Sequence, residues 1–282
     1  MTTASDQPTL PHSVEAPGPA AAPHEESNIV AELGLIGRWI VRTFIELPRA
    51  LRFPTEVTRQ LANLVLSSSM ILWLVSLTAG FLVAKFAFYL VEQIGATAYI
   101  GLATGIASIT ALLTILFGFM VAGKVACGFV AELGSMRINE EIDALEVMGI
   151  PSRQYLVGTR VLAAIIAIPL VYIAGVGLCF IAARVASIDM FNAVSPGGYN
   201  YVFWSVVTPM VLVKSIALVW SLGAFSVIVG CYYGFNVRGG PVEVGDATAR
   251  SMMVNVVAIT MLGSGITFQL LFGTTLEIPI AN

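Results

Sequence analysis

Apolar residues run through this chain in long blocks, separated by short stretches that hold most of its polar side chains. A helix needs about 20 consecutive, mainly apolar residues to cross the hydrocarbon core of a bilayer. Five blocks meet that length, at about residues 64–90, 97–124, 155–183, 202–231 and 251–272. The pattern therefore predicts an all-α integral membrane protein with five transmembrane helices.

The segment before the first block, residues 28–62, alternates apolar positions such as Trp39 with basic ones such as Arg38 and Arg42. It is too charged to cross a membrane, but it suits the interface, where its arginines would lie among lipid headgroups. We predict an interfacial elbow helix here; the alternative is ordinary basic sequence that flanks a span. Residues 1–27 are rich in Pro, Ala, Ser and Thr and lack the features of a signal peptide, which predicts a disordered cytoplasmic tail.

The basic residues predict the orientation of the spans. If the N-terminus is cytoplasmic, all but three of the 14 Lys and Arg residues lie on the cytoplasmic side, the exceptions being Lys85, Arg184 and Lys214. An excess of Lys and Arg marks the cytoplasmic side of membrane proteins. Five spans then place the C-terminus, with a short tail at 276–282, outside the cytoplasm.

The most polar loop, residues 131–151, lies between the second and third predicted spans and holds five carboxylates. Asn139 is a candidate N-cap, because its side-chain oxygen can accept from a free amide at a helix start. Gly149 is a typical residue for a helix end. These signals predict a short helix over residues 140–148.

This short helix is predicted to be amphipathic and acidic. At about 100° per residue, Ile138, Ile142 and Leu145 share one narrow face, while Asp143 lies on the opposite side and Glu141 at the border. A stripe this narrow, next to so many carboxylates, favours a helix that docks in a groove of another protein.

Composition excludes several classes of protein. With 57% hydrophobic and 11% charged residues, the chain is not an ordinary soluble domain. Cys127, Cys179 and Cys231 lie in or beside apolar blocks without metal-ligand spacing, which favours free thiols over disulfides or a metal site. Both histidines fall in the N-terminal tail, so no Ser/His/Asp or Cys/His set is available, and no aromatic and basic surface suggests nucleic acid.

One run imitates a nucleotide-binding motif. Residues 118–124 have the glycine and lysine spacing of a phosphate-binding loop, but Val125 follows where Ser or Thr would hold Mg²⁺. The run also lies inside a predicted span. We therefore expect no cofactor in this chain, and any ATP and Mg²⁺ that drive it would be bound by another polypeptide.

Three runs carry a family resemblance. Residues 131–137, Ala-Glu-Leu-Gly-Ser-Met-Arg, together with 140–145, Glu-Glu-Ile-Asp-Ala-Leu, resemble the coupling-helix signature of the MlaE/YrbE permeases. Residues 157–163 are similar to that family's entry into its third span, and Lys214 with Ser215 matches a Lys-Ser pair in its fourth. The resemblance covers roughly residues 30–275.

The resemblance implies a function. MlaE/YrbE permeases are the membrane subunits of Mce-type lipid ABC transporters, in the bacterial plasma membrane. It implies a core of two permease chains, a cytoplasmic dimer of ABC ATPases, extracytoplasmic Mce-type substrate-binding proteins and a lipid substrate. The residues that it assigns to ATPase coupling are Arg137, Ile138, Glu140, Glu141, Ile142, Asp143 and Leu145.

The chain also departs from the family. Many members carry Arg-Glu-Leu-Gly-Pro where residues 110–114 read Thr-Ala-Leu-Leu-Thr, and a proline common in the family is replaced by Thr159. The loss of the charged pair would be tolerated if the second permease were a different chain. That favours an actinobacterial-type pair of YrbE paralogues, although an identical partner stays open.

Two lysines lie within the predicted spans. Lys214 falls near the middle of the fourth, where a charge facing lipid is costly, so we expect it to face the protein interior. It would serve either as a structural bridge or as a contact for substrate. Lys85, near the outer end of the first span, is expected to reach the interface or to pair with Glu92.

Two glycine pairs, Gly101 with Gly105 and Gly230 with Gly234, place small residues on one helix face. Such faces allow two helix backbones to approach closely. Packing within the chain is the simpler interpretation, and a subunit interface is the alternative.

Two other functions compete with a permease. An intramembrane lipid-modifying enzyme would need paired carboxylates, His or Cys within the spans, which the sequence does not supply. A non-transporting scaffold would have no need for an acidic helix directed at the cytoplasm. The lipid and the direction of transport stay open.

Overall fold

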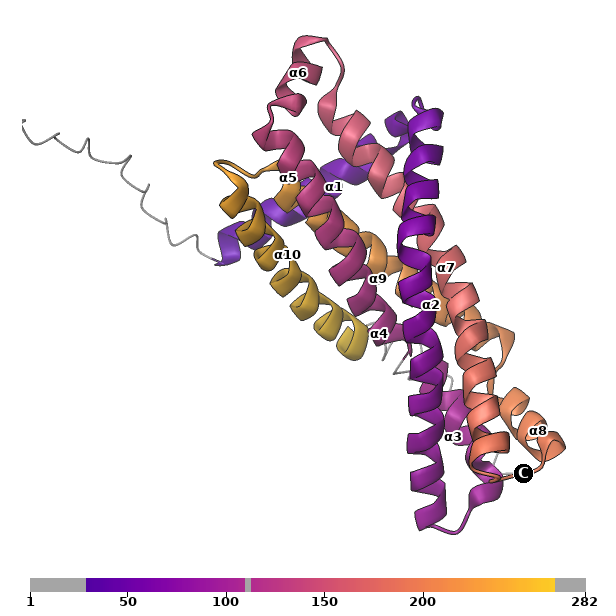
Figure 1. The fold of residues 1–282 in the computed structure, drawn as a ribbon. Coiled ribbons are helices and arrows are strands. Elements are labelled where there is room, and N and C mark those ends of the chain that lie inside the picture. Colours follow the sequence, from indigo (N-terminus) through magenta and orange to yellow (C-terminus); the bar gives the residue numbers. More distant parts are fainter. Residues whose placement is uncertain (1–28, 110–112, 267–282) are drawn as a thin grey trace, which may run out of the picture.

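The computed structural model describes residues 29–109 and 113–266, and in that part every regular element is a helix. Two long helices, α2 (Pro54–Gln93) and α7 (Thr159–Val185), pack side by side along the molecule (Figure 1). Four continuous helical stretches are long and apolar enough to cross a membrane: Pro54–Gln93, Leu113–Ile138, Arg153–Met190 and Pro209–Phe235. The predicted all-α integral membrane fold is confirmed.

The other elements complete these stretches and join them. They are α1 (Ile29–Ala50), η1 (Thr97–Tyr99), α3 (Ile100–Ala107), α4 (Leu113–Met120), η3 (Val121–Ala126), α5 (Cys127–Ile138), α6 (Glu141–Val147), η4 (Arg153–Gly158), η5 (Ala186–Met190), α8 (Pro196–Val206), α9 (Pro209–Phe235), α10 (Pro241–Met261) and η6 (Leu262–Ile266). The segments η3, η4, η5 and η6 are π-helical.

The predicted span 202–231 is wrong as a single helix, because the chain breaks between α8 and α9. Thr208 is extended, with φ −81° and ψ 151°, and Pro209 begins α9. A residue before proline is pushed toward extended conformations, and a proline at the first helical position has no amide to leave unpaired. The short helix α8 instead packs on α3 at the end of the molecule farthest from α6 (Figure 1).

Two other predicted spans also differ from the structure. The span at 97–124 is divided between the short helices η1 and α3 and the long stretch that begins at Leu113, and residues 110–112 are not described. The last span was expected at 251–272, but α10 already begins at Pro241. The end of that expected span, and the tails at 1–27 and 276–282, lie outside the described residues.

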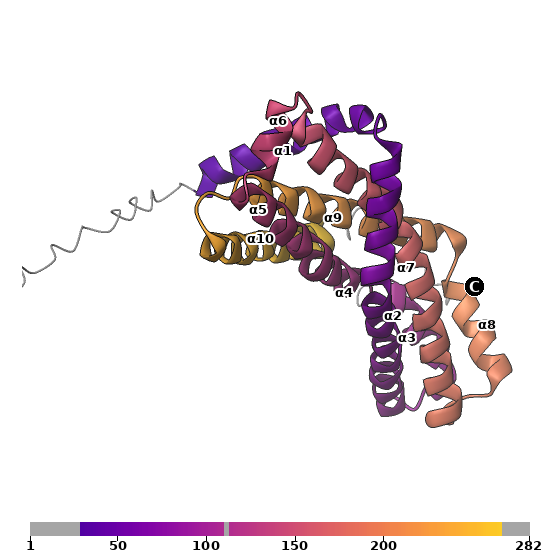
Figure 2. The same ribbon diagram turned by 45° about the horizontal axis from the view of Figure 1, so that its top comes forward.

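The predicted interfacial segment is divided in two. Helix α1 continues through Pro48 to Ala50, and a new helix, α2, starts at Pro54, so residues 54–62 belong to the first span. Helix α1 lies across the α6 end of the molecule, against η4 and α9 (Figures 1 and 2). The structure thus separates a helix that lies across the bundle from one that runs along it.

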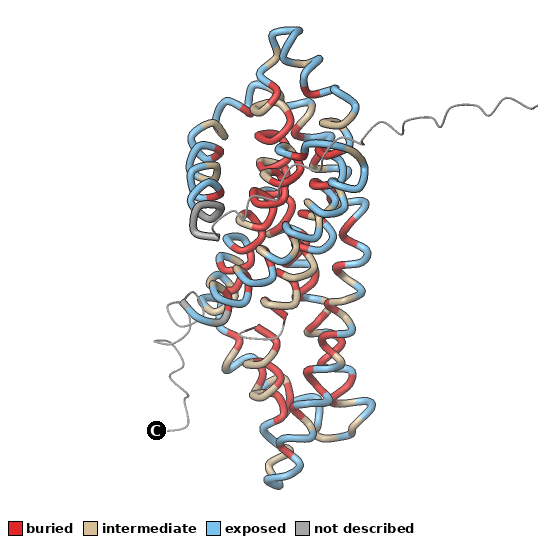
Figure 3. Tube along the Cα trace, turned by 90° about the vertical axis from the view of Figure 1, so that its left-hand side faces the viewer, coloured by how far each residue is buried: buried red, intermediate tan, exposed pale blue. Residues whose placement is uncertain are grey.

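Burial follows the seam where the helices meet, and exposed residues cover the outside (Figure 3). On α2, Leu66, Met70 and Leu74 are 80%, 78% and 63% exposed and lie four residues apart, on one face. The buried face of α2 carries small residues such as Ser76 and Gly80. Large apolar side chains outside and small ones at the helix contacts are what packing in a lipid environment favours.

The glycine pairs pack within the chain. A Cβ atom at Gly230 would lie 2.7 Å from the carbonyl oxygen of Ala126, so α9 approaches η3 backbone to backbone. One at Gly101 would lie 2.8 Å from the carbonyl oxygen of Tyr199 in α8. The simpler of the two interpretations, close helix packing inside one chain, is confirmed at these positions.

Candidate functional site

The predicted short helix exists as α6, at one end of the molecule between α5 and η4 (Figure 1). Its predicted cap is wrong. Asn139 ends α5, with its amide donating to the carbonyl of Ser135 at 3.0 Å, and Glu140 precedes α6 in a left-handed conformation with φ 59°. Only Asn139 and Glu140 separate the two helices, and the left-handed backbone of Glu140 changes the direction of the chain between them. The predicted end is confirmed, since Gly149 has φ 75° and follows the last turn.

The apolar stripe of α6 faces this chain rather than a partner. Ile142 is completely buried in the main core, which also contains Leu133 and Leu156, and Leu145 packs against the same core. The expectation that Ile142 contacts another protein is therefore wrong. The stripe is the surface with which α6 covers the ends of its own neighbours.

The surface that α6 leaves exposed is acidic with an apolar end. Glu140, Glu141 and Asp143 are exposed, and beyond them Val147 and Met148 are 90% and 66% exposed. We call Glu140, Glu141, Asp143, Val147 and Met148 the α6 face. Sequence reasoning missed the last two, although both are large apolar residues that lie off the predicted stripe.

One ion pair and one hydrogen bond fix α6 to the segments on either side. Arg137 pairs with Asp143 at 2.5 Å, across the turn between α5 and α6. At the other end the Ser152 hydroxyl donates to Glu146 at 2.6 Å. Two predicted coupling residues, Arg137 and Asp143, thus contact each other.

A second ion pair joins α5 to α7 beneath this turn. Arg160 donates to both carboxylate oxygens of Glu132, at 2.7 and 3.4 Å, and to the carbonyl of Leu156 at 3.0 Å. The side chain of Arg160 is only 3% exposed, while that of Glu132 is 47% exposed. Both residues lie in runs that carry the family resemblance, but nothing in the sequence showed that they pair.

A third contact joins α1 to η4. The guanidinium carbon of Arg153 lies 3.9 Å from the centre of the Trp39 ring, and its Nε lies 3.4 Å from Glu46. Trp39 also contacts the rings of Tyr232 and Phe235 in α9. A cation over an aromatic face is attracted by the ring electrons, so α1 is attached to the segment that leads from α6 into α7.

Hydroxyl groups join three helices deep in the bundle. Thr114 of α4 lies 3.2 Å from both Tyr172 of α7 and Ser215 of α9, and the last two hydroxyls also bond to each other. All three side chains are fully buried. The adjacent Lys214 is partly buried in the second turn of α9, so it lies nearer a helix end than predicted. Its role as a bridge or a substrate contact stays a prediction.

Lys85 lies apart from these groups, exposed on α2 in the half of that helix far from α6. Within residues 29–109 and 113–266, the ion pairs do not include one between Lys85 and Glu92. The described part of the chain also holds no group of three metal-ligating side chains.

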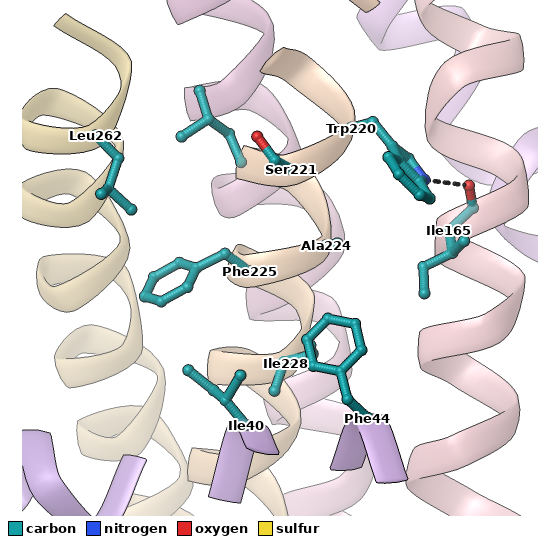
Figure 4. Close-up of a pocket in the computed structure, with 10 residues that line it drawn as sticks. Ile40, Phe44, Ile165, Trp220, Ser221, Ala224, Phe225, Ile228 and Leu262 are labelled. Carbon is teal, nitrogen blue, oxygen red and sulfur yellow. Dashed lines mark hydrogen bonds between the residues drawn. The ribbon is translucent and has the colours of Figure 1, made fainter. Parts of the chain in front are cut away.

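An apolar cavity of about 410 Å³ opens between α1, α7, α9 and η6 (Figure 4). Its walls include Phe44, Phe225 and Leu262. The indole of Trp220 donates a hydrogen bond to the carbonyl of Ile165 at 2.9 Å. In a regular helix that carbonyl would accept from the amide of residue 169, but Pro169 has no amide hydrogen to donate. The cavity lies within the size range of ligand pockets, about 300–1,000 Å³, and it suits a hydrocarbon group.

Comparison with known proteins decides the family. The sequence model of the family described as Permease MlaE matches residues 57–268. This chain belongs to the MlaE permease family. The match in this MlaE permease starts just inside α2, so it contains α6 and all three hydroxyl residues but leaves out α1.

Several relatives of this MlaE permease carry informative names. A "Probable ABC transporter permease protein" of Synechocystis is 28% identical over 229 residues, 77% of this chain and 82% of that protein. One of the same description from Rickettsia bellii is 28% identical over 158 residues, 56% of this chain and 60% of that protein. The Arabidopsis thaliana protein TRIGALACTOSYLDIACYLGLYCEROL 1, chloroplastic, is 27% identical over 189 residues, 65% of this chain and 53% of the relative. The matches thus span little more than half of two of these three relatives.

Proposed function

We propose that this chain is the permease subunit of an ATP-driven lipid transporter. The observation that carries the proposal is the α6 face, an exposed acidic and apolar surface. An ion pair holds α6 to α5, and a hydrogen bond holds it to Ser152, just before η4. Membership of the MlaE family and relatives described as ABC transporter permeases support it. The name of the Arabidopsis relative, which is that of a galactolipid, and the apolar cavity favour a lipid as the substrate.

In this proposal α6 is the coupling helix and docks on a cytoplasmic ABC ATPase. Val147 and Met148 supply the apolar anchor, and Glu141 and Asp143 face a basic rim on the ATPase. Exposed large apolar residues beside charges are typical of binding surfaces. The partner ATPases bind ATP and Mg²⁺, so this chain is not itself an enzyme.

The rest of the assembly follows the family resemblance. A second permease, a YrbE-type paralogue or an identical chain, completes the membrane core, and extracytoplasmic Mce-type proteins exchange lipid with it. The complex lies in the bacterial plasma membrane, with the N-terminus in the cytoplasm and the C-terminus outside.

The ion pairs suggest how a push on α6 would travel. Through Arg137 and Asp143 a displacement of α6 reaches α5, and the pair of Glu132 with Arg160 carries it to α7. The stacked pair of Arg153 and Trp39 carries it to α1. Because these elements are linked by short contacts, they would move as one body, which is the kind of rigid-body shift that helix bundles use.

Charge reversal on the α6 face tests the proposal. Glu141→Arg should reduce the ATPase recovered with the purified permease, and lipid transport with it, because a like charge then meets the basic rim. Met148→Ala should also weaken the complex, since truncation of an apolar anchor typically costs about 1–3 kcal/mol. Glu92→Arg, an exposed reversal at the far end of α2, is the matched control and should change neither quantity.

The same experiment separates a transporter from a scaffold. A non-transporting scaffold or an intramembrane enzyme would not require an ATPase at α6. Full ATPase recovery and full transport in Glu141→Arg together with Met148→Ala would rule out α6 as the coupling element.

A further inference from the structure

A polar cleft of about 190 Å³ opens between α2 and the η3–α5 segment. Polar side chains from both walls line it: Gln60, Asn63, Ser67 and Ser68 from α2, with Lys124 and Glu132 from the other wall. None of these groups belongs to the α6 face or to the hydroxyl cluster.

The cleft lies at one edge of the hydrocarbon. The part of α2 between Arg59 and Lys85 carries no charged side chain, and at about 1.5 Å per residue it is long enough to cross a core of ~30 Å. Asn63 and Ser67 lie in its first turns, near the end of the molecule that holds α1 and α6, which the Lys and Arg distribution predicts to be cytoplasmic. The cleft therefore faces the headgroup region of that leaflet.

Asn63 and Ser67 carry polar groups that are available to a ligand in the cleft. Asn63 and Ser67 are one helical turn apart and are both exposed. Ser67 is within 3.5 Å of Ser68, and among the hydrogen bonds of the described residues none involves the Asn63 side chain. Polar groups in an apolar environment without partners are costly, whereas beside a lipid headgroup they are satisfied.

The cleft keeps one positive charge. Glu132 is paired with the buried Arg160. Glu56, which lies 3.6 Å from Arg59, accepts a hydrogen bond from Gln60 of the cleft. Lys124 is exposed and makes no hydrogen bond or ion pair with the residues that the structure describes. Its ammonium is the charge left to attract an anion.

The backbone opposite α2 leaves room beside Lys124. Lys124 lies in the π-helical turn η3, and such turns inside α-helices frequently occur at functional sites. One turn further on, Gly128 borders the cleft, and a Cβ atom there would meet nothing within 4 Å. The wall next to Lys124 therefore has open space where a side chain would otherwise stand.

We propose that this cleft binds the phosphate of an anionic phospholipid. Lys124 pairs with the phosphate, and Ser67 and Asn63 donate hydrogen bonds to it. The acyl chains lie along the exposed apolar face of α2 that begins at Leu66. Basic pockets between membrane helices on the cytoplasmic side are suited to anionic headgroups, and a lysine binds phosphate as a point charge.

The test is native mass spectrometry of the full chain, purified in detergent with the subunits that accompany it and titrated with dioleoyl phosphatidylglycerol. Lys124→Gln should weaken phosphatidylglycerol binding about tenfold, the size expected for one charge-assisted hydrogen bond. Lys124→Arg should keep most of it. Asn63→Leu with Ser67→Leu should also weaken it, and Lys85→Gln, an exposed lysine at the other end of α2, should leave it unchanged.

Two further titrations identify the source of the phosphate. Dioleoylglycerol, which has the same chains and no phosphate, should show no difference between Lys124→Gln and the unaltered chain. Inorganic phosphate in large excess should not displace phosphatidylglycerol; if it does, the site is one for free phosphate and the lipid assignment is overturned. Equal losses in Lys124→Gln and Lys85→Gln, or no loss in Lys124→Gln, also overturn it.

This binding is measured without ATP. It therefore requires only that the chain lies in a membrane, and it can succeed or fail independently of lipid transport.

Discussion

At the scale of single residues, a backbone defect in one span is repaired by a side chain from another. Pro169 leaves the carbonyl of Ile165 without its usual helical donor, and the Trp220 indole supplies one from α9 at 2.9 Å. The sequence contained both residues, but only the packing of α9 on α7 brings them together. Hydropathy predicts that a span crosses the membrane. It does not predict which neighbouring helix supplies the hydrogen-bond donor that a proline lacks.

Trp220→Phe should therefore destabilise the protein by about 0.5–1.5 kcal/mol beyond its loss of contact area, the range for one hydrogen bond in a protein or membrane. The loss should shrink when Pro169→Ala is also present, because alanine restores the missing amide donor. Thermal unfolding of the four proteins of this cycle in detergent measures the coupling. Trp204→Phe is the control, because the Trp204 indole forms no hydrogen bond with the described residues. If the effects of Trp220→Phe and Pro169→Ala on stability simply add, the indole does not compensate for the proline.

The two partners of the Arg160–Glu132 ion pair differ in how far they are buried, so the loss of each should affect stability differently. Glu132→Ala leaves a guanidinium that is 3% exposed without its carboxylate, while Arg160→Met leaves a carboxylate that was already 47% exposed and can be hydrated. A lost partner of a buried charge costs about 3–5 kcal/mol. Glu132→Ala should therefore lower the unfolding temperature more than Arg160→Met does. The reverse order would mean that Arg160 is hydrated in the folded protein.

At the scale of elements, periodicity predicted that a helix exists but not which of its faces is buried. The 3.6-residue period found α6 and its apolar stripe, but a stripe looks the same whether it faces a partner or its own chain. Here Ile142 faces the core, and the exposed apolar residues are Val147 and Met148, outside the stripe. By contrast, Pro209 marks the break before α9 in the sequence. The single span predicted at 202–231 followed hydropathy alone and did not take this proline into account.

Trp39 is the aromatic side chain that joins helix α1 to two neighbouring elements. Trp39 stacks with Arg153 and contacts Tyr232 and Phe235, so it joins α1 to both η4 and α9. Trp39→Ala should release α1 from the bundle, with faster amide hydrogen exchange in α1 by about tenfold or more, since large aromatic truncations in well-packed sites cost several kcal/mol. Val41→Ala, at a 60% exposed position of the same helix, should leave exchange unchanged. Equal exchange in both variants would show that α1 is held by other contacts.

At the scale of the whole molecule, polar contacts are concentrated at two levels. Ion pairs gather at the end that holds α1, α6 and η4, whereas hydroxyl groups such as Thr114, Tyr172 and Ser215 join the spans inside the bundle. Buried hydroxyls can be satisfied without carrying charge into an apolar interior, which explains why charged pairs are kept to the end. In the described chain, charged pairs therefore join the helices at one end, and the apolar outer face is left to lipid.

The molecule's two ends also differ in what they expose, and this makes its orientation testable. Ser135 lies exposed at the α6 end, and Gly197 lies exposed in the first turn of α8 at the opposite end. All but three of the 14 Lys and Arg residues are predicted to lie on the α6 side of the membrane.

In a background with Cys127, Cys179 and Cys231 replaced, Gly197→Cys should react with a membrane-impermeant thiol reagent in intact cells, and Ser135→Cys should react only after the cells are opened. Both positions are at the surface, so a difference in reaction reports the side of the membrane rather than burial. Reaction of Ser135→Cys in intact cells would reverse the orientation, and α6 could then not meet an ATPase in the cytoplasm.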